Sequence, residues 1–86
     1  MERIEAGMFA LSKAGHDKGS LYLIIKTEGE YVYLADGKLR PLEKLKKKKC
    51  RHIQIIHRRQ EDWNPEQISN DDVKRAIRQY KQSPQP

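Results

Sequence analysis

The segment KLKKKKCRHIQIIHRR, residues 44–59, joins a dense positive charge to an apolar run. It holds eight Lys/Arg and two His in sixteen residues and contains no acid, yet it encloses Ile53, Ile55 and Ile56. Lysine binds phosphate as a point charge, and arginine adds a planar fork that clamps a phosphate or stacks on an unpaired base. The segment therefore favours anion binding. The alternative interpretation is a charged sheet edge that deters aggregation.

We expect Lys46 to Lys49 to form a loop, because a strand would direct alternate side chains to opposite faces. In a loop, all four ammonium groups can reach a phosphate track. The candidate phosphate-binding residues of this region and the hairpin before it are Lys38, Arg40, Lys46, Lys47, Lys48, Lys49, Arg51, Arg58 and Arg59.

A second candidate site is the polar loop framed by Gly15 and Gly19. It carries Lys13, His16 and Lys18 on a backbone that two glycines free for close approach to another chain. Its backbone N–H groups could bind phosphate. The alternative is that the glycines only permit a tight turn and a kink in the sheet.

Other chemistry is less well supported. Cys50, His52 and His57 are metal-ligand types, and residues 50 and 52 would share one face of a strand, but paired C-x-x-C spacing is absent. Neighbouring lysines could activate the Cys50 thiol, yet the sequence supplies no organised base or acid beside it. We expect no metal, no cofactor, no small-molecule substrate and no enzymatic activity.

Length and charge set the bounds for these sites. A chain of 86 residues can form one domain, and its formal charge of +6 favours nucleic acid, an acidic protein surface or anionic lipid as partner. No apolar run approaches the roughly 20 residues of a membrane span. The N-terminus, MERIEAGMF, has acids where a signal peptide would be basic. We expect a cytoplasmic protein that does not enter the membrane, and the single cysteine fits a reducing compartment.

The elements that must position the candidate sites are five short strands. Short apolar runs bounded by turn residues predict strands over residues 8–13, 21–25, 31–35, 42–45 and 51–57. Asp36 and Gly37 predict a tight hairpin turn. So small a sheet must curl into a barrel to bury its apolar side chains. Residues 21–25 are apolar on both faces, which is expected if the strand bends between two halves of the barrel or if another segment covers its outer face.

A C-terminal helix is the expected cover. Ser69 is a suitable N-cap, and four apolar residues at helical spacing predict an amphipathic helix over residues 69–82. The barrel would then occupy residues 1–59, a connector residues 60–68 and a frayed tail residues 83–86. We expect Trp63 to cover the open end of the barrel rather than stack on a base. For Tyr22, Tyr31 and Tyr33, packing in the core or on the barrel surface is favoured over stacking.

At this point the residues resemble a known family. GMFALSKAGHDKGSLYLII, residues 7–25, followed by YLADG, residues 33–37, resembles the KOW motif, with a spacing similar to the large-subunit ribosomal proteins of the "fourteen-e" family and to small bacterial KOW proteins. The resemblance covers residues 4 to 58 and leaves out the helix. Its structural positions are Gly7, Gly15, Gly19, Asp36 and Gly37. It implies a five-stranded SH3-like barrel that binds RNA or ribosomal partners.

The sequence thus predicts a mainly β protein, a small SH3-like barrel with one C-terminal helix, that binds RNA. Ribosomal RNA or the large ribosomal subunit and its proteins are the expected partners, and translation is the expected setting. Phosphate docking and RNA shape would supply most of the recognition. One alternative is a protein-interaction module that binds an acidic surface on a transcription or ribosome-assembly partner. A non-specific DNA-binding protein is a further alternative.

Overall fold

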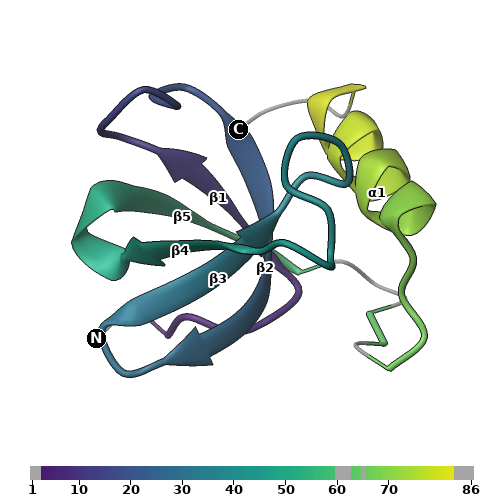
Figure 1. The fold of residues 1–86 in the computed structure, drawn as a ribbon, viewed down its shortest axis with the longest axis horizontal. Helices are drawn as coiled ribbons and strands as arrows, with labels where there is room; N and C mark the ends of the chain where they lie inside the picture. The colour runs from purple at the N-terminus through teal and green to yellow at the C-terminus, as the bar shows by residue number, and fades with distance from the viewer. Residues whose placement is uncertain (1–2, 60–62, 65, 83–86) are drawn as a thin grey trace.

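The computed structural model describes residues 3–59, 63–64 and 66–82, which form an antiparallel sheet followed by one helix (Figure 1). The mainly β prediction is confirmed at this level. The elements are β1 (Met8–Ser12), β2 (Leu21–Glu28), β3 (Tyr31–Ala35), β4 (Lys46–Lys49), the short 3₁₀ turn η1 (Cys50–His52), β5 (Ile53–Arg59) and α1 (Asn70–Gln82).

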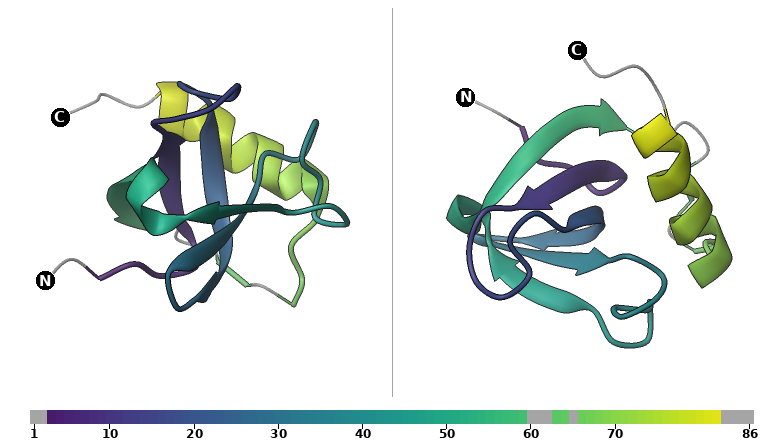
Figure 2. Two further views of the ribbon diagram at one scale, coloured as in Figure 1. Left: turned by 60° about the vertical axis from the view of Figure 1, so that its left-hand side comes forward. Right: turned by 90° about the horizontal axis from the view of Figure 1, so that it is seen from above.

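The five strands lie in the order β4-β3-β2-β1-β5, so β4 and β5 are the edges of the sheet in the described residues. These two edges are nevertheless consecutive in the chain and are joined by the three residues of η1. Three residues span at most about 10 Å. The sheet must therefore curl strongly, and Figure 2 shows the strands bending round with α1 along one side.

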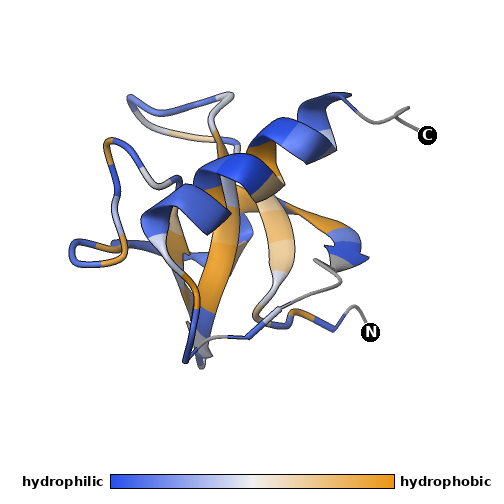
Figure 3. Ribbon diagram, turned by 90° about the vertical axis from the view of Figure 1, so that its right-hand side faces the viewer, coloured by the Kyte–Doolittle hydropathy of each residue, from blue (hydrophilic) through white to orange (hydrophobic). Residues whose placement is uncertain are grey.

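Both faces of the sheet are apolar. The first face carries the cluster of Met8, Ala10, Tyr22, Ile24, Val32, Leu34 and Ile53. The second face carries Phe9, Leu21, Leu23 and Ala35, which pack against Val73, Ala76 and Ile77 of α1. Figure 3 shows the hydrophilic side of α1 turned outward and the hydrophobic sheet beneath it. Of the two explanations for the apolar faces of residues 21–25, a covering segment is the one that α1 provides.

Helix α1 is held at both its start and its apolar face. The Ser69 hydroxyl accepts a hydrogen bond from the N–H of Asp72 at 3.1 Å, which is the predicted N-cap. Burial of Val73 and Ile77 stabilises the docked helix by roughly 1.5–3 kcal/mol for each side chain. Trp63, before the helix, packs on the second-face cluster and lies against Gly7, where a Cβ atom would come 2.9 Å from the indole Cγ.

The predictions for residues 36–49 are wrong in two respects. Residues 36–45 form one long loop, which replaces both the predicted turn at Asp36 and Gly37 and the strand at 42–45. The lysine run is not a loop but the edge strand β4, because both of its sides find partners. Lys47 lies over the rings of Tyr31 and Tyr33 on one side, and Lys48 reaches a carboxylate on the other.

Two smaller differences concern strand limits. Strand β2 continues to Glu28, so the turn that follows it is confined to residues 29 and 30. The last strand begins at Ile53 rather than at residue 51, because Cys50–His52 is helical. Cys50 and His52 therefore do not share the face of a strand.

Candidate nucleic-acid interface

The loop between β1 and β2, residues 13–20, exposes the side chains of Lys13, His16 and Lys18. Its backbone is closed on itself. The N–H groups of Lys18, Gly19 and Ser20 donate to carbonyl oxygens of Gly15, Ser12 and Asp17, at 2.9–3.3 Å. These three N–H groups are therefore not available to a phosphate. Gly15 and Gly19 both have positive φ, the backbone conformation that both interpretations of the two glycines need.

Asp17 organises this loop from within. Its Oδ1 atom lies 2.5 Å from the ammonium group of Lys48 and 2.9 Å from the hydroxyl of Ser12, and its Oδ2 atom accepts a hydrogen bond from Tyr22 at 2.8 Å. Lys48 also donates to the carbonyl of Ala14 at 2.9 Å. The side chains of Lys48 and Asp17 are only 10% and 17% exposed. Lys48, predicted to contact phosphate, is thus engaged inside the protein.

The ionisation of this cluster follows from its contacts. Burial of the Asp17 carboxyl raises its pKa, but hydrogen bonds from Lys48, Tyr22 and Ser12 outweigh burial and hold that pKa well below its usual range. Burial, together with the hydrogen bond to Asp17, raises the pKa of Tyr22 to about 12. At neutral pH Asp17 is therefore a carboxylate and Tyr22 a neutral phenol.

The loop of residues 36–45 is fixed to the start of α1. Asp36 Oδ1 accepts hydrogen bonds from the N–H groups of Lys38 and Arg40, both at 2.8 Å. The side chain of Asn70 accepts from the N–H of Leu42 at 2.7 Å and donates to the Glu43 carboxylate. These bonds fix the backbone at Lys38 and Arg40 and tie the loop to the start of α1.

Gly37 permits the close approach of this loop to α1. It is buried and has a φ of +81°. A Cβ atom at this position would lie 2.5 Å from the carbonyl oxygen of Asn70 and 2.7 Å from Cγ of Lys74. The glycine is thus required by contact with the helix, which the sequence did not indicate.

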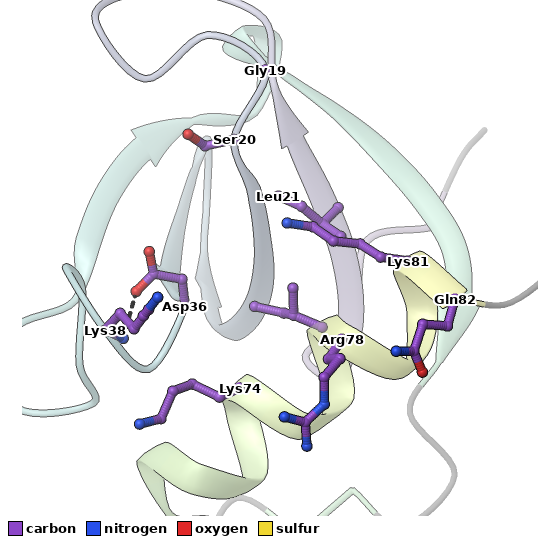
Figure 4. A pocket seen from close by; sticks show the side chains of 10 residues that line it. Gly19, Ser20, Leu21, Asp36, Lys38, Lys74, Arg78, Lys81 and Gln82 are labelled. Carbon is purple, nitrogen blue, oxygen red and sulfur yellow. Dashed lines mark hydrogen bonds between the residues drawn. The ribbon is translucent and has the colours of Figure 1, made fainter.

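A pocket of about 720 Å³ lies between α1 and the ends of the two loops (Figure 4). Lys74, Arg78 and Lys81 follow successive turns of α1 along one side, with Asp36 and Lys38 on the opposite side. These three helix residues are not among the predicted phosphate-binding residues. The signal was present, because they recur at intervals of four and three residues beside the apolar stripe of the helix.

A second pocket of about 480 Å³ lies on the other side of residues 36–40. Its lining includes three further cations, Arg40, Lys44 and Lys46, together with His16 and the highly exposed Leu39. Both pockets are lined by Ser20 and Asp36, so they adjoin. Together we call them the basic groove, whose seven Lys/Arg are Lys38, Arg40, Lys44, Lys46, Lys74, Arg78 and Lys81.

Two carboxylates line the basic groove, and both are already engaged. Asp17 is paired with Lys48, and Asp36 accepts the two loop N–H groups. Just outside the lining, the exposed carboxylate of Asp71 lies 3.3 Å from the ammonium group of Lys74. The groove therefore keeps a strong excess of positive charge on three segments of the chain.

The remaining predicted residues lie elsewhere. Lys47 and Lys49 are on the second face of the sheet, and Arg51 is exposed in η1. The guanidinium carbon of Arg58 lies 5.6 Å from the centre of the Tyr80 ring. The side chain of Arg59, at the end of β5, lies outside the described residues. The predicted set is thus divided among the two loops, both faces of β4, η1 and the C-terminal end of β5.

The described residues hold no group of three or more His, Cys, Asp or Glu side chains placed to bind a metal ion. No helix in this part of the chain has the length and apolar character needed to cross a membrane. The chain matches no protein-family model and no curated protein sequence.

Proposed function

We propose that the protein is an RNA-binding module that docks on phosphates through the basic groove. The observation that carries this proposal is the convergence of seven Lys/Arg from the loop of residues 36–45, β4 and α1, while both lining carboxylates are bound internally. A concave basic surface concentrates positive potential and attracts a polyanion. It suits the folded backbone of an RNA better than a single small anion, because the cations extend over two adjoining pockets.

Phosphate contacts position an RNA without reading its sequence. Lysines predominate in the groove, and they bind phosphate without the fixed geometry of an arginine fork. The loop of residues 36–45 and α1 are held together by the bonds of Asn70, so the spacing of the cations is preorganised. Discrimination would therefore rest on RNA shape more than on base edges.

The proposal extends to the kind of domain and its target. The KOW resemblance of residues 7–25 and 33–37, together with five antiparallel strands whose edges are joined by η1, supports an SH3-like barrel of the KOW type. On that resemblance we propose ribosomal RNA or the large ribosomal subunit as the target. Sedimentation of a cell lysate at low and high salt tests this target. Comigration with large subunits that is lost at high salt is expected, and absence from ribosomal fractions at both salts would contradict it.

The groove itself is tested by two matched variants on one helix. Arg78 lines the groove, whereas Arg75 pairs with Asp72 and lines a different pocket. Binding of a labelled stem-loop RNA is measured by fluorescence anisotropy at several salt concentrations. We expect Arg78→Gln to weaken binding and to reduce the salt slope by about 0.7–0.9, the effect of one phosphate contact. Arg75→Gln should change neither, and equal behaviour of the two variants would contradict the groove.

A further inference from the structure

The second face of the sheet carries two tyrosines that the apolar core does not use. Tyr31 and Tyr33 lie two residues apart on β3, so both side chains point to the same face, the face that α1 covers at Ala35. They are half-buried and belong to neither core cluster. In the described residues their hydroxyl groups make no hydrogen bond, whereas Tyr22 donates to Asp17.

Lysines of the two neighbouring strands surround these rings. The ammonium group of Lys47 lies 4.3 Å from the centre of the Tyr31 ring and 5.9 Å from that of Tyr33. Lys49 lies 6.0 Å from the Tyr31 ring, and Lys26 lies 5.3 Å from the Tyr33 ring. We call Lys26, Tyr31, Tyr33, Lys47 and Lys49 the tyrosine strip.

The strip has a net positive charge. Lys26 is 3.5 Å from the carboxylate of Glu28, and both side chains are largely exposed. Within the described residues, Lys47 and Lys49 form no ion pair with a carboxylate, and their interactions are with the ring faces. A base can displace the ammonium group from the ring face, because a cation–π contact is weak at an exposed site. The displaced ammonium group can then pair with a phosphate, since an exposed ion pair also forms and breaks at little cost.

We propose that the tyrosine strip binds unpaired bases of single-stranded RNA, with each base stacked on a ring and the lysines on the flanking phosphates. This inference rests on the proposed function, since it assigns a second surface to the same ligand class. Unpaired strands are bound by positive charge combined with exposed rings, and the strip supplies both within three adjacent strands.

Strand geometry favours an unpaired strand over a duplex. Residues two apart on a strand are separated by about 6.6–6.8 Å. This is about twice the 3.4 Å rise per nucleotide of a stacked strand. Neighbouring bases inside a helix cannot both lie on the two rings, whereas bases that have left their stack can. The strip therefore selects loops, bulges or ends of an RNA whose helical parts the basic groove can hold.

The test compares a single-stranded RNA of about ten nucleotides with a duplex of the same sequence. The protein variant Tyr31→Val/Tyr33→Val removes both rings but keeps residues with high strand propensity. We expect its Kd for the single strand to rise about tenfold for each ring lost, with little change for the duplex. Tyr31→Phe/Tyr33→Phe keeps the rings and should bind the single strand like the unaltered protein.

The outcomes separate the strip from the groove. Loss of single-strand binding in the valine variant together with loss for both RNAs in Arg78→Gln supports both surfaces. An unchanged Kd of the valine variant for the single strand would overturn the strip while leaving the groove. An equal loss for both RNAs in the valine variant would also overturn the strip. Unchanged binding by Arg78→Gln would contradict the groove alone.

A second measurement uses the unaltered protein and so does not depend on whether the valine variant folds. Single-stranded RNA carrying 5-iodouridine is crosslinked by light, and the crosslinked residues are identified by mass spectrometry. Crosslinks at Tyr31 or Tyr33 are expected. Crosslinks confined to groove residues, or displacement of the RNA by an equal concentration of polyglutamate, would overturn the assignment to unpaired bases.

Discussion

The ammonium group of Lys48 lies 2.5 Å from Oδ1 of Asp17, and this contact ties the edge strand β4 to the loop of residues 13–20 across 31 positions of the chain. Both side chains are largely buried. The contact explains how a run of four lysines can form a strand, since one of them is needed inside the protein.

Lys48→Met should therefore destabilise the fold. Loss of the ammonium group leaves the Asp17 carboxylate without its cation, and breaking a buried pair in this way costs about 3 kcal/mol. Urea denaturation measures the free energy of unfolding. The matched control is Lys47→Met on the exposed side of the same strand, where we expect a loss within about 1 kcal/mol. Equal stability of the two variants would refute the structural role of Lys48.

Acid should weaken the fold through Asp17. Its pKa is lowered in the folded protein, because its hydrogen bonds outweigh burial, so its contribution is present above the unfolded pKa of about 3.9 and is lost as pH falls toward the folded value. We expect the free energy of unfolding to decline below about pH 4. In Asp17→Asn, which cannot ionise at this position, the free energy of unfolding should decline less over the same pH range. An identical pH profile for the variant would show that Asp17 is not responsible.

Tyr22 gives the same cluster a spectroscopic signature. Its raised pKa means that one of the four tyrosines should ionise only at about pH 12. Ultraviolet absorbance of tyrosinate, followed during an alkaline titration, measures this step. Tyr22→Phe should remove it. If the late step persists in that variant, it belongs to another residue.

Gly37→Ala should loosen the start of α1. The added Cβ would meet the Asn70 carbonyl and Lys74, in a backbone conformation that is itself unfavourable for alanine. Gly29→Ala is the control, because Gly29 also has positive φ but has open space around it. The control should cost about 1–2 kcal/mol in the free energy of unfolding, and Gly37→Ala should cost at least about 1 kcal/mol more. Indistinguishable costs would mean that the loop and the helix are not in contact.

The regular elements could be predicted because their signals are local. The short apolar runs and the glycine turns predict four of the strands, and the Ser69 cap predicts the helix. The predicted limits of these elements agree with the observed limits to within a few residues. Residues 21–25 are apolar on both faces, and one of the two interpretations of this pattern, a segment that covers the outer face, agrees with the position of α1. Leu42 and Leu45 misled the strand prediction, because they pack on the second-face cluster from a loop.

The candidate site was less predictable because its parts meet through contacts distant in the chain. Nothing near Lys48 in the sequence shows that its partner is Asp17. The groove also depends on the hydrogen bond between Asn70 and Leu42, which are 28 residues apart, and without it Lys74 and Arg78 have no reason to be grouped with Lys38. Charge density in the sequence predicts an anionic ligand, whereas the docking of α1 determines which charges converge.

The salt dependence of RNA binding tests the central claim most directly. The affinity of the unaltered protein for a stem-loop RNA is measured between about 50 and 200 mM salt. If about five of the groove's cations contact phosphates, the slope of log K against log salt should be about −3.5 to −4.5. A slope near zero would contradict phosphate docking by the basic groove.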